Sequence, residues 1–135
     1  MTLTKLAGND IVKAKEIADK FVATFQNIPR TIFFAIGGTA TCVASVLQEL
    51  SIYDPKKVDG YIIEYDSLTK LQEKLYSLSV EERKKIVGLQ IERADIIQSG
   101  VSILCSIANM LGMEKFIVSE SDNLEGYLLL KLEKV

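Results

Sequence analysis

Apolar residues spaced three and four positions apart predict the first helix of the chain. Asn9 or Asp10 can cap a helix that starts at Ile11. Apolar residues then recur along one face, at Ile11, Ala14, Ala18, Phe21 and Phe25. Lysine and glutamate side chains occupy the opposite face, so the pattern is that of an amphipathic helix that ends near Asn27. Pro29 marks the break after it.

A continuous apolar run over residues 31–36 predicts a strand. Its sequence, TIFFAI, is rich in β-branched and aromatic residues, which is typical of a strand buried on both faces in a parallel sheet covered by helices. Gly37-Gly38 follows at once, and Thr39 can cap a second helix that continues to Leu50. This order of strand, double glycine and helix is typical of half a βαβ unit.

The middle of the chain predicts a loop, a short edge strand and two helices. The loop covers residues 51–57 and the edge strand residues 60–64. Asp66 can cap a helix that carries leucines at helical spacing. Ser79 with Glu82 three positions later fits a capping box before a further short helix.

The last third predicts a long helix and a second buried strand. The helix runs from about Glu92 to Leu111, and its wide apolar stripe indicates a central, buried position. Gly112 supplies a left-handed cap at its end. Residues 114–118 predict the strand, and residues 123–134 a terminal helix. The order of elements predicts a helix-rich α/β fold in which several helices cover a short parallel sheet.

Composition excludes several classes of function. A chain of 135 residues with 48% hydrophobic and 25% charged residues is expected to form a single domain, residues 1–135, with a sizeable core. It has no histidine, which removes Ser-His, Cys-His and histidine–metal mechanisms. Two cysteines cannot build a disulfide scaffold. We expect Cys42 and Cys105 to be free, packed thiols.

Charge and hydropathy narrow the expected partners. The net charge is −2 with a pI near 5.2, and the lysine and arginine runs at 56–57 and 83–85 sit beside acidic residues. A nucleic-acid binder usually shows a basic patch, so neither DNA nor RNA is expected as a partner. No run of 18 apolar residues occurs, so no membrane partner is expected. The first five residues lack a signal-peptide core, which makes cytoplasmic residence the expectation.

The sharpest candidate for ligand binding is Gly37-Gly38-Thr39-Ala40-Thr41. A helix N-terminus offers unpaired N–H groups and the positive end of the helix dipole. Glycines just before it let an anionic or flat ligand approach the backbone, and Thr39 and Thr41 add hydroxyl donors. Neither the dinucleotide fingerprint nor the Walker pattern is present. On spacing alone, a tight turn capped by threonine is the favoured alternative.

Arg93 is the second candidate. It lies in the stretch Glu92-Arg93-Ala94-Asp95 and could present its planar guanidinium to a phosphate. On spacing alone, a surface ion pair with Glu92 and Asp95 is favoured instead. The spacing of the acidic residues between 54 and 66 fits no calcium loop and indicates a solvated loop. Ser119, Ser121 and Asp122 follow the second predicted strand, where ligand crevices of open α/β sheets lie.

In this order the motifs resemble the exopolyphosphatase/guanosine pentaphosphate phosphohydrolase (Ppx/GppA) family of the actin-like superfamily. The matches are residues 37–41, 53–58 before Gly60-Tyr61, 92–97, Gly100, Ile103, Leu104, Val118-Ser119 and Glu125-Gly126. Order and spacing agree from about Thr31 to Leu130. Two positions depart from the family pattern. Asp59 stands where the family often has histidine, and residues 122–126 lack the arginine of Gly-Leu-Arg-Glu-Gly, which puts in doubt any ligand contact of that loop.

The resemblance implies a two-lobed parent enzyme of which this chain is part. In the family, a phosphate loop with an aspartate and a general-base glutamate belong to the first lobe, and an Asp-x-Gly-Gly-Gly-Ser loop opens the second. None of these precedes Gly37 here. The chain therefore resembles the later part of the second, ribonuclease H-like lobe, without catalytic residues or metal ligands of its own. The missing N-terminal lobe is then an expected partner.

The resemblance also implies a reaction and a set of contacts. The parent enzyme would cleave terminal phosphoanhydride bonds of polyphosphate or guanosine pentaphosphate with Mg²⁺, and this chain alone would bind no cofactor and be inactive. The residues implied to contact the phosphate chain or nucleotide are Gly37, Gly38, Thr39, Thr41 and Arg93.

Two other functions stay open at this stage. A truncated sheet leaves a strand edge unpaired, and such edges invite pairing. The chain could therefore be a non-catalytic interaction module that forms a homodimer. A sugar or acetate kinase lobe would keep the superfamily but change the chemistry, and the matches at 53–60 and 92–97 disfavour it.

Overall fold

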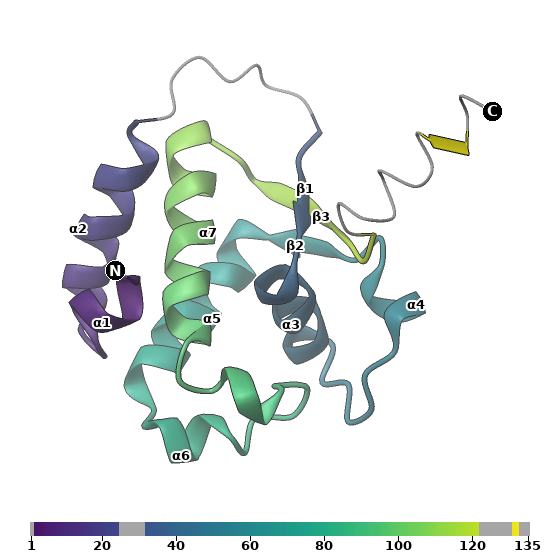
Figure 1. Cartoon of the computed structure of the whole chain (residues 1–135), viewed down its shortest axis with the longest axis horizontal. Coiled ribbons are helices and arrows are strands. Elements are labelled where there is room, and N and C mark those ends of the chain that lie inside the picture. The colour runs from purple at the N-terminus through teal and green to yellow at the C-terminus, as the bar shows by residue number, and fades with distance from the viewer. Residues whose placement is uncertain (1, 25–31, 122–130, 133–135) are drawn as a thin grey trace.

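Helices α1 (Leu3–Ala7) and α2 (Ile11–Val22) open the chain in the computed structural model, which describes residues 2–24, 32–121 and 131–132 (Figure 1). The predicted cap of α2 is confirmed, because the Asp10 carboxylate accepts a hydrogen bond from the backbone N–H of Lys13 at 3.1 Å. The helix ends at Val22, earlier than predicted. Helix α1 was not predicted, since five residues are too few to show a helical period.

The sheet has three strands in the order β1-β3-β2, with β1 at Phe34–Ile36, β2 at Ile62–Glu64 and β3 at Lys115–Ser119. Strands β1 and β3 pair in parallel, as predicted, but β2 is antiparallel to β3, so the sheet is mixed. The chain enters β2 beside the carboxyl end of β3, where the backbone N–H of Gly60 donates to the carbonyl of Val118 at 2.8 Å. From that position β2 can only run back along β3.

Strand β1 is exposed on one face, so the prediction of burial on both faces is wrong. Phe33 and Ala35 pack against the core, whereas Phe34 and Ile36 on the other face are 60% and 55% exposed. In the described residues β1 pairs with β3 alone. The apolar run therefore marks a strand with one face against the core and one face uncovered.

Helix α3 (Gly38–Leu47) follows β1 directly. Its N-cap is Gly37, so the prediction that Thr39 caps the helix is wrong, and the helix stops at Leu47 rather than Leu50. Helix α4 (Pro55–Val58) occupies part of the predicted loop. Here the Asp54 side chain accepts from the backbone N–H of Lys56 at 3.0 Å, and a proline at the first helical position suits a helix start.

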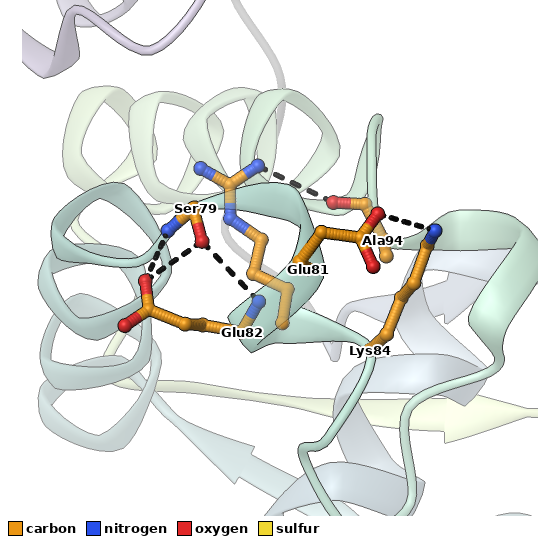
Figure 2. A network of polar contacts seen from close by, with 6 residues as sticks. Ser79, Glu81, Glu82, Lys84 and Ala94 are labelled. Atoms are coloured by element: carbon orange, nitrogen blue, oxygen red, sulfur yellow. Dashed lines mark hydrogen bonds and ion pairs between the residues drawn. The ribbon is translucent and has the colours of Figure 1, made fainter.

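The next two helices are α5 (Tyr65–Ser77) and α6 (Val80–Arg83). Helix α5 begins at Tyr65 with Glu64 as N-cap, so Asp66 lies in the first turn instead of capping it. The predicted capping box is confirmed. Figure 2 shows the Ser79 side chain and the Glu82 carboxylate each bonded to the other residue's backbone N–H.

Helix α7 (Ile97–Leu111) starts later than predicted, because residues 91–93 form a separate 3-10 turn, η1 (Ile91–Arg93). Two hydrogen bonds from side chains to backbone carbonyls hold this break. The buried Arg83 guanidinium donates to the carbonyl of Ala94 at 3.3 Å, and the Gln98 amide donates to that of Asp95 at 3.0 Å. Gly112 closes α7 in the left-handed conformation, as predicted, with φ 61° and ψ 38°.

The core lies between the sheet and helices α3, α5 and α7. Helix α7 packs on α2, α5 and α3 (Figure 1), which confirms its predicted central position. Fully buried side chains from each layer meet there: Val43, Ile63, Leu68, Val101 and Val118. The helix-rich α/β fold class is thereby confirmed. The predicted terminal helix lies almost wholly outside the described residues.

None of the helices within 2–24, 32–121 and 131–132 combines the length and the hydropathy needed to span a membrane.

Candidate functional site

The double glycine lies at the carboxyl edge of the parallel strand pair. Ile36 at the end of β1 is in register with Ser119 at the end of β3, and Gly37 and Gly38 follow Ile36 into α3. Ligands of open α/β sheets bind at this edge. The position predicted from the strand–glycine–helix order is therefore the one that the fold provides.

The backbone at Gly37 is open and needs glycine. Its φ is +100°, which is strained for any residue with a Cβ, and a Cβ added there would meet no atom within 4 Å. As the N-cap of α3 it offers no side-chain hydrogen bond to the first turn. The first N–H groups of a helix have no partner within the helix, so this turn presents donors and a positive partial charge.

Arg93 lies directly against Gly38. A Cβ built on Gly38 would overlap the Cζ, Nη1 and Nη2 atoms of the Arg93 guanidinium. Because glycine has no Cβ, the guanidinium can lie on the backbone of the first turn of α3. The structure thus brings together two positive features, a helix N-terminus and an arginine, from distant parts of the sequence.

Arg93 makes no ion pair within the part of the chain that the structure describes. The ion pairs found there are Lys70–Asp66 and Lys84–Glu81, so the predicted alternative of a pair with Glu92 and Asp95 is wrong. The Nε–H of Arg93 donates to the neutral Oε1 of Gln90 at 2.7 Å instead. The arginine charge is therefore held in place without being neutralised.

The two threonines of the motif point their hydroxyl groups at the protein. Thr39 packs against α7, since a Cβ added to Gly100 would come within 2.6 Å of the Thr39 Oγ1. The Thr41 hydroxyl donates to the carbonyls of Gly37 and Gly38 at 3.4 Å each. The donors that remain for a ligand are the main-chain N–H groups and the Arg93 guanidinium.

Three of the four acidic residues between 54 and 66 make separate structural contacts. Asp54 caps α4, Asp66 pairs with Lys70 at 2.6 Å, and Asp59 accepts from the backbone N–H of Glu120 at 3.0 Å. Asp59 thereby fixes the loop that leaves β3 beside the double glycine. Within 2–24, 32–121 and 131–132, no three His, Cys, Asp or Glu side chains are placed to hold a metal ion.

Both cysteines are free and buried, as predicted. Burial raises the pKa of the Cys42 thiol, and the backbone N–H of Gln90 and the charge of Arg93 oppose that rise. Burial raises the pKa of Cys105 to about 12, with Lys15 acting in the opposite direction. Thiol nucleophiles react as thiolates, so neither residue is suited to covalent chemistry at neutral pH.

Sequence reasoning did not single out Gln90. Its signal would have been the spacing of three residues to Arg93, which places two side chains on one side of a helical turn. The spacing does not show that the Oε1 of Gln90 accepts from Arg93 or that the Arg93 guanidinium lies against Gly38. Both facts need the folded structure.

Comparison with known proteins places these features in a family context. The model of the Ppx/GppA phosphatase family matches residues 7–135. A bifunctional 3-dehydroquinate synthase/phosphatase from Fusobacterium nucleatum subsp. nucleatum is 32% identical over 124 residues, which cover 87% of this chain and 18% of that protein.

Solved structures agree with the fold. The Aquifex aeolicus member of the Ppx/GppA family superposes with a TM-score of 0.90 at 24% identity, over 98% of this chain and 45% of that one. An exopolyphosphatase from Cytophaga hutchinsonii superposes with a TM-score of 0.70 at 19% identity, over 95% of this chain and 43% of that one. These superpositions agree with the helix-rich α/β fold of the chain. The chain spans less than half the length of these relatives.

Proposed function

Because this chain belongs to the Ppx/GppA phosphatase family, we propose that it is part of a phosphohydrolase that cleaves terminal phosphoanhydride bonds of polyphosphate or guanosine pentaphosphate. Its own task is to bind the phosphate chain or nucleotide. The groups that bind are the main-chain N–H groups at Gly37, Gly38 and Thr39 together with the Arg93 guanidinium, and Thr41 supports the turn.

One observation carries this proposal, the contact between Arg93 and Gly38 at the N-terminus of α3. A phosphate oxygen can accept from backbone N–H groups of a helix start and from a guanidinium, whose planar fork matches two phosphate oxygens. Arg93 has no anionic partner in the described residues, so a bound phosphate would supply the missing negative charge.

The remaining chemistry needs groups from elsewhere. Phosphoryl transfer to water relies on positioning and charge stabilisation, with a residue that orients the water and metal ions that bridge phosphate oxygens. Within the described residues no three His, Cys, Asp or Glu side chains are grouped to hold a metal ion, so the proposal places the ligands of the Mg²⁺ expected for the parent enzyme outside this chain. This chain would contribute substrate positioning and positive charge. The missing N-terminal lobe would supply the catalytic groups.

Arg93→Ala is expected to weaken binding of tripolyphosphate to the 135-residue chain by about tenfold or more, since a charge-assisted hydrogen bond contributes roughly 1.5–3 kcal/mol. Isothermal titration calorimetry measures the affinity, and backbone amide shifts locate the site. Lys20→Ala is the matched control. It removes an exposed positive charge from α2, on the far side of α7 from α3 (Figure 1), and should change the affinity less than twofold at 0.15 M salt, where charges beyond about 8 Å are screened.

Equal loss of affinity in both variants would mean non-specific charge attraction and would contradict the proposal. Binding that saturates without shifting the amide signals of Gly37 and Gly38 would also contradict the proposal. A parallel titration with guanosine pentaphosphate separates the two substrate classes, because only the nucleotide offers a base and ribose for additional shifts.

A second candidate function, a non-catalytic dimerisation module, is favoured by one surface. The side chains of Phe34, Ile117 and Ile62 form a row in register across β1, β3 and β2, and Phe34 and Ile62 are 60% and 48% exposed. An apolar row beside a strand edge that has no partner in the described residues is typical of a surface that another protein layer covers. For the dimerisation module, the covering layer would be a second copy of the chain.

Phe34→Lys is expected to raise the dimer dissociation constant at least tenfold if this second function is correct, because a lysine in the row would be desolvated in the interface. Size-exclusion chromatography with light scattering measures the mass across concentrations. Ile52→Lys is the control, since Ile52 is 82% exposed and lies outside the sheet. A wild-type chain that stays monomeric at millimolar concentration would rule out the dimer.

Residence in the cytoplasm is part of the first proposal. The cytosol keeps thiols reduced, and the free, buried thiols of Cys42 and Cys105 support that location.

A further inference from the structure

We propose that Gln90 is a positioning residue for Arg93, holding the guanidinium in the geometry that receives a phosphate oxygen at the start of α3. This inference rests on the proposed phosphate site. It adds a residue that lies outside the Gly37–Thr41 motif and assigns a task to its side-chain amide.

The Arg93 guanidinium is held by a hydrogen bond at one end and lies against Gly38 at the other. The Nε–H is the N–H group nearest the aliphatic stem, and it donates to the Oε1 of Gln90 at 2.7 Å. With this end fixed, the Nη1 and Nη2 groups at the other end lie against Gly38. One hydrogen bond therefore sets the orientation of the whole planar group relative to the helix N-terminus.

The side chain that holds Arg93, the Gln90 amide, carries no charge. A carboxylate in place of the Gln90 amide would hold the arginine equally well, but it would form an ion pair and cancel the charge that attracts a phosphate. The amide oxygen accepts a hydrogen bond without carrying a charge. Gln90 thus fixes Arg93 and leaves its positive charge for a ligand.

The backbone segment that carries Gln90 and Arg93 is held rigidly against the rest of the fold. Gly88 lies so close to α3 that a Cβ there would overlap the Ser45 carbonyl, and Leu89 is buried. The backbone N–H of Arg93 donates to the carbonyl of Gln90 at 2.9 Å, and Arg83 holds the carbonyl of Ala94. The backbone is anchored at both ends, so the side-chain bond completes a preformed site.

Arginine side-chain NMR tests the positioning in the absence of ligand. The chain has three arginines, Arg30, Arg83 and Arg93, so few Nε–H signals need assignment. Gln90→Met keeps the length of this exposed side chain and removes the acceptor. We expect hydrogen exchange of the Arg93 Nε–H to become at least about tenfold faster, because the bond that protects it is lost. The Arg83 Nε–H, which donates to the carbonyl of Leu75 at 2.7 Å, should be unchanged and reports that the fold is intact.

Tripolyphosphate titration tests the consequence for binding. Gln90→Met should weaken the affinity about three- to tenfold, because a freely rotating arginine must be ordered on binding. Gln90→Glu should keep the Arg93 Nε–H protected and still weaken binding at least tenfold, because the carboxylate neutralises the guanidinium. If Gln90 only stabilised the fold, Gln90→Glu would not weaken tripolyphosphate binding while the Arg93 Nε–H stays protected from exchange.

The outcomes distinguish this inference from the function on which it rests. Unchanged exchange of the Arg93 Nε–H in Gln90→Met overturns the positioning role, whatever the affinity. Unchanged affinity in Gln90→Met, with binding lost in Arg93→Ala, overturns it as well and leaves the phosphate site standing. If the wild-type chain does not bind tripolyphosphate, the proposed function fails, and the inference that Gln90 prepares a phosphate site falls with it.

Discussion

Gly88→Ala is expected to lower the free energy of unfolding by about 2–5 kcal/mol, the sum of backbone strain and a steric overlap. The φ of Gly88 is +85°, which residues with a Cβ rarely adopt, and the added Cβ would overlap the carbonyl of Ser45 and lie 2.9 Å from the Cα of Val46. These are backbone atoms of a buried helix, so they cannot move aside as a flexible side chain could. Urea denaturation followed by circular dichroism measures the change.

Gly8→Ala provides the matched control. Its φ is +58° and its ψ is −120°, a region that residues with a Cβ rarely adopt, but a Cβ there would meet nothing within 4 Å. Gly8→Ala therefore carries a strain of about 1–3 kcal/mol without the overlap. The difference between the two variants measures how tightly the segment before Arg93 is pressed against α3. Equal costs for the two variants would show that this close approach contributes nothing.

Arg83→Met is expected to lower the free energy of unfolding by about 3–5 kcal/mol, because removal of the buried guanidinium leaves neutral acceptors unpaired at a cost of roughly 1–3 kcal/mol each. Arg83 is 1% exposed. It donates to the carbonyls of Leu75 and Ala94 at 2.7 Å and 3.3 Å and to the Oδ1 of Asn9. These three acceptors belong to α5, to the residue that follows η1 and to the turn between α1 and α2, so one side chain joins three parts of the fold.

The measurement is again urea denaturation, with Arg83→Lys as the comparison. Lysine keeps the charge but has a single ammonium group that cannot reach all three acceptors, so an intermediate cost is expected. If Arg83→Met were as stable as the wild type, the three hydrogen bonds would not hold the segment that carries Arg93, and the anchoring of the site at Ala94 would be disproved.

Short-range patterns predicted most of the individual elements. The Asp10 cap and the Ser79–Glu82 capping box each involve residues three positions apart, and the helix stop at Gly112 depends on one residue's φ. Such interactions are encoded within a few residues, so spacing and residue type are enough to find them. The same holds for the placement of Gly37 and Gly38 between a strand and a helix.

The tertiary arrangement accounts for the predictions that were wrong. The helical spacing predicted that α7 begins near Glu92. The helix begins later because the Arg83 guanidinium donates a hydrogen bond to the carbonyl of Ala94. The apolar run of β1 indicated burial on both faces, but one face of the strand is uncovered. Thr39 has the chemistry of a helix cap, yet it packs against Gly100 of α7. A residue from another part of the fold decided the outcome at Ala94 and at Thr39, and the lack of a covering layer in the described residues decided it at β1.

The sequence by itself determined that this chain has a helix-rich α/β fold with a glycine turn leading into a helix, and it carried the likeness to the Ppx/GppA family. Only the tertiary structure decided that the Arg93 guanidinium lies against the glycine turn. Spacing favoured the acidic neighbours of Arg93, whereas the folded chain places Gly38 under its guanidinium and Gln90 at its Nε. The physical reason is that a charged side chain takes its partner from whatever the fold brings near it, and sequence spacing reports only the neighbours along the chain.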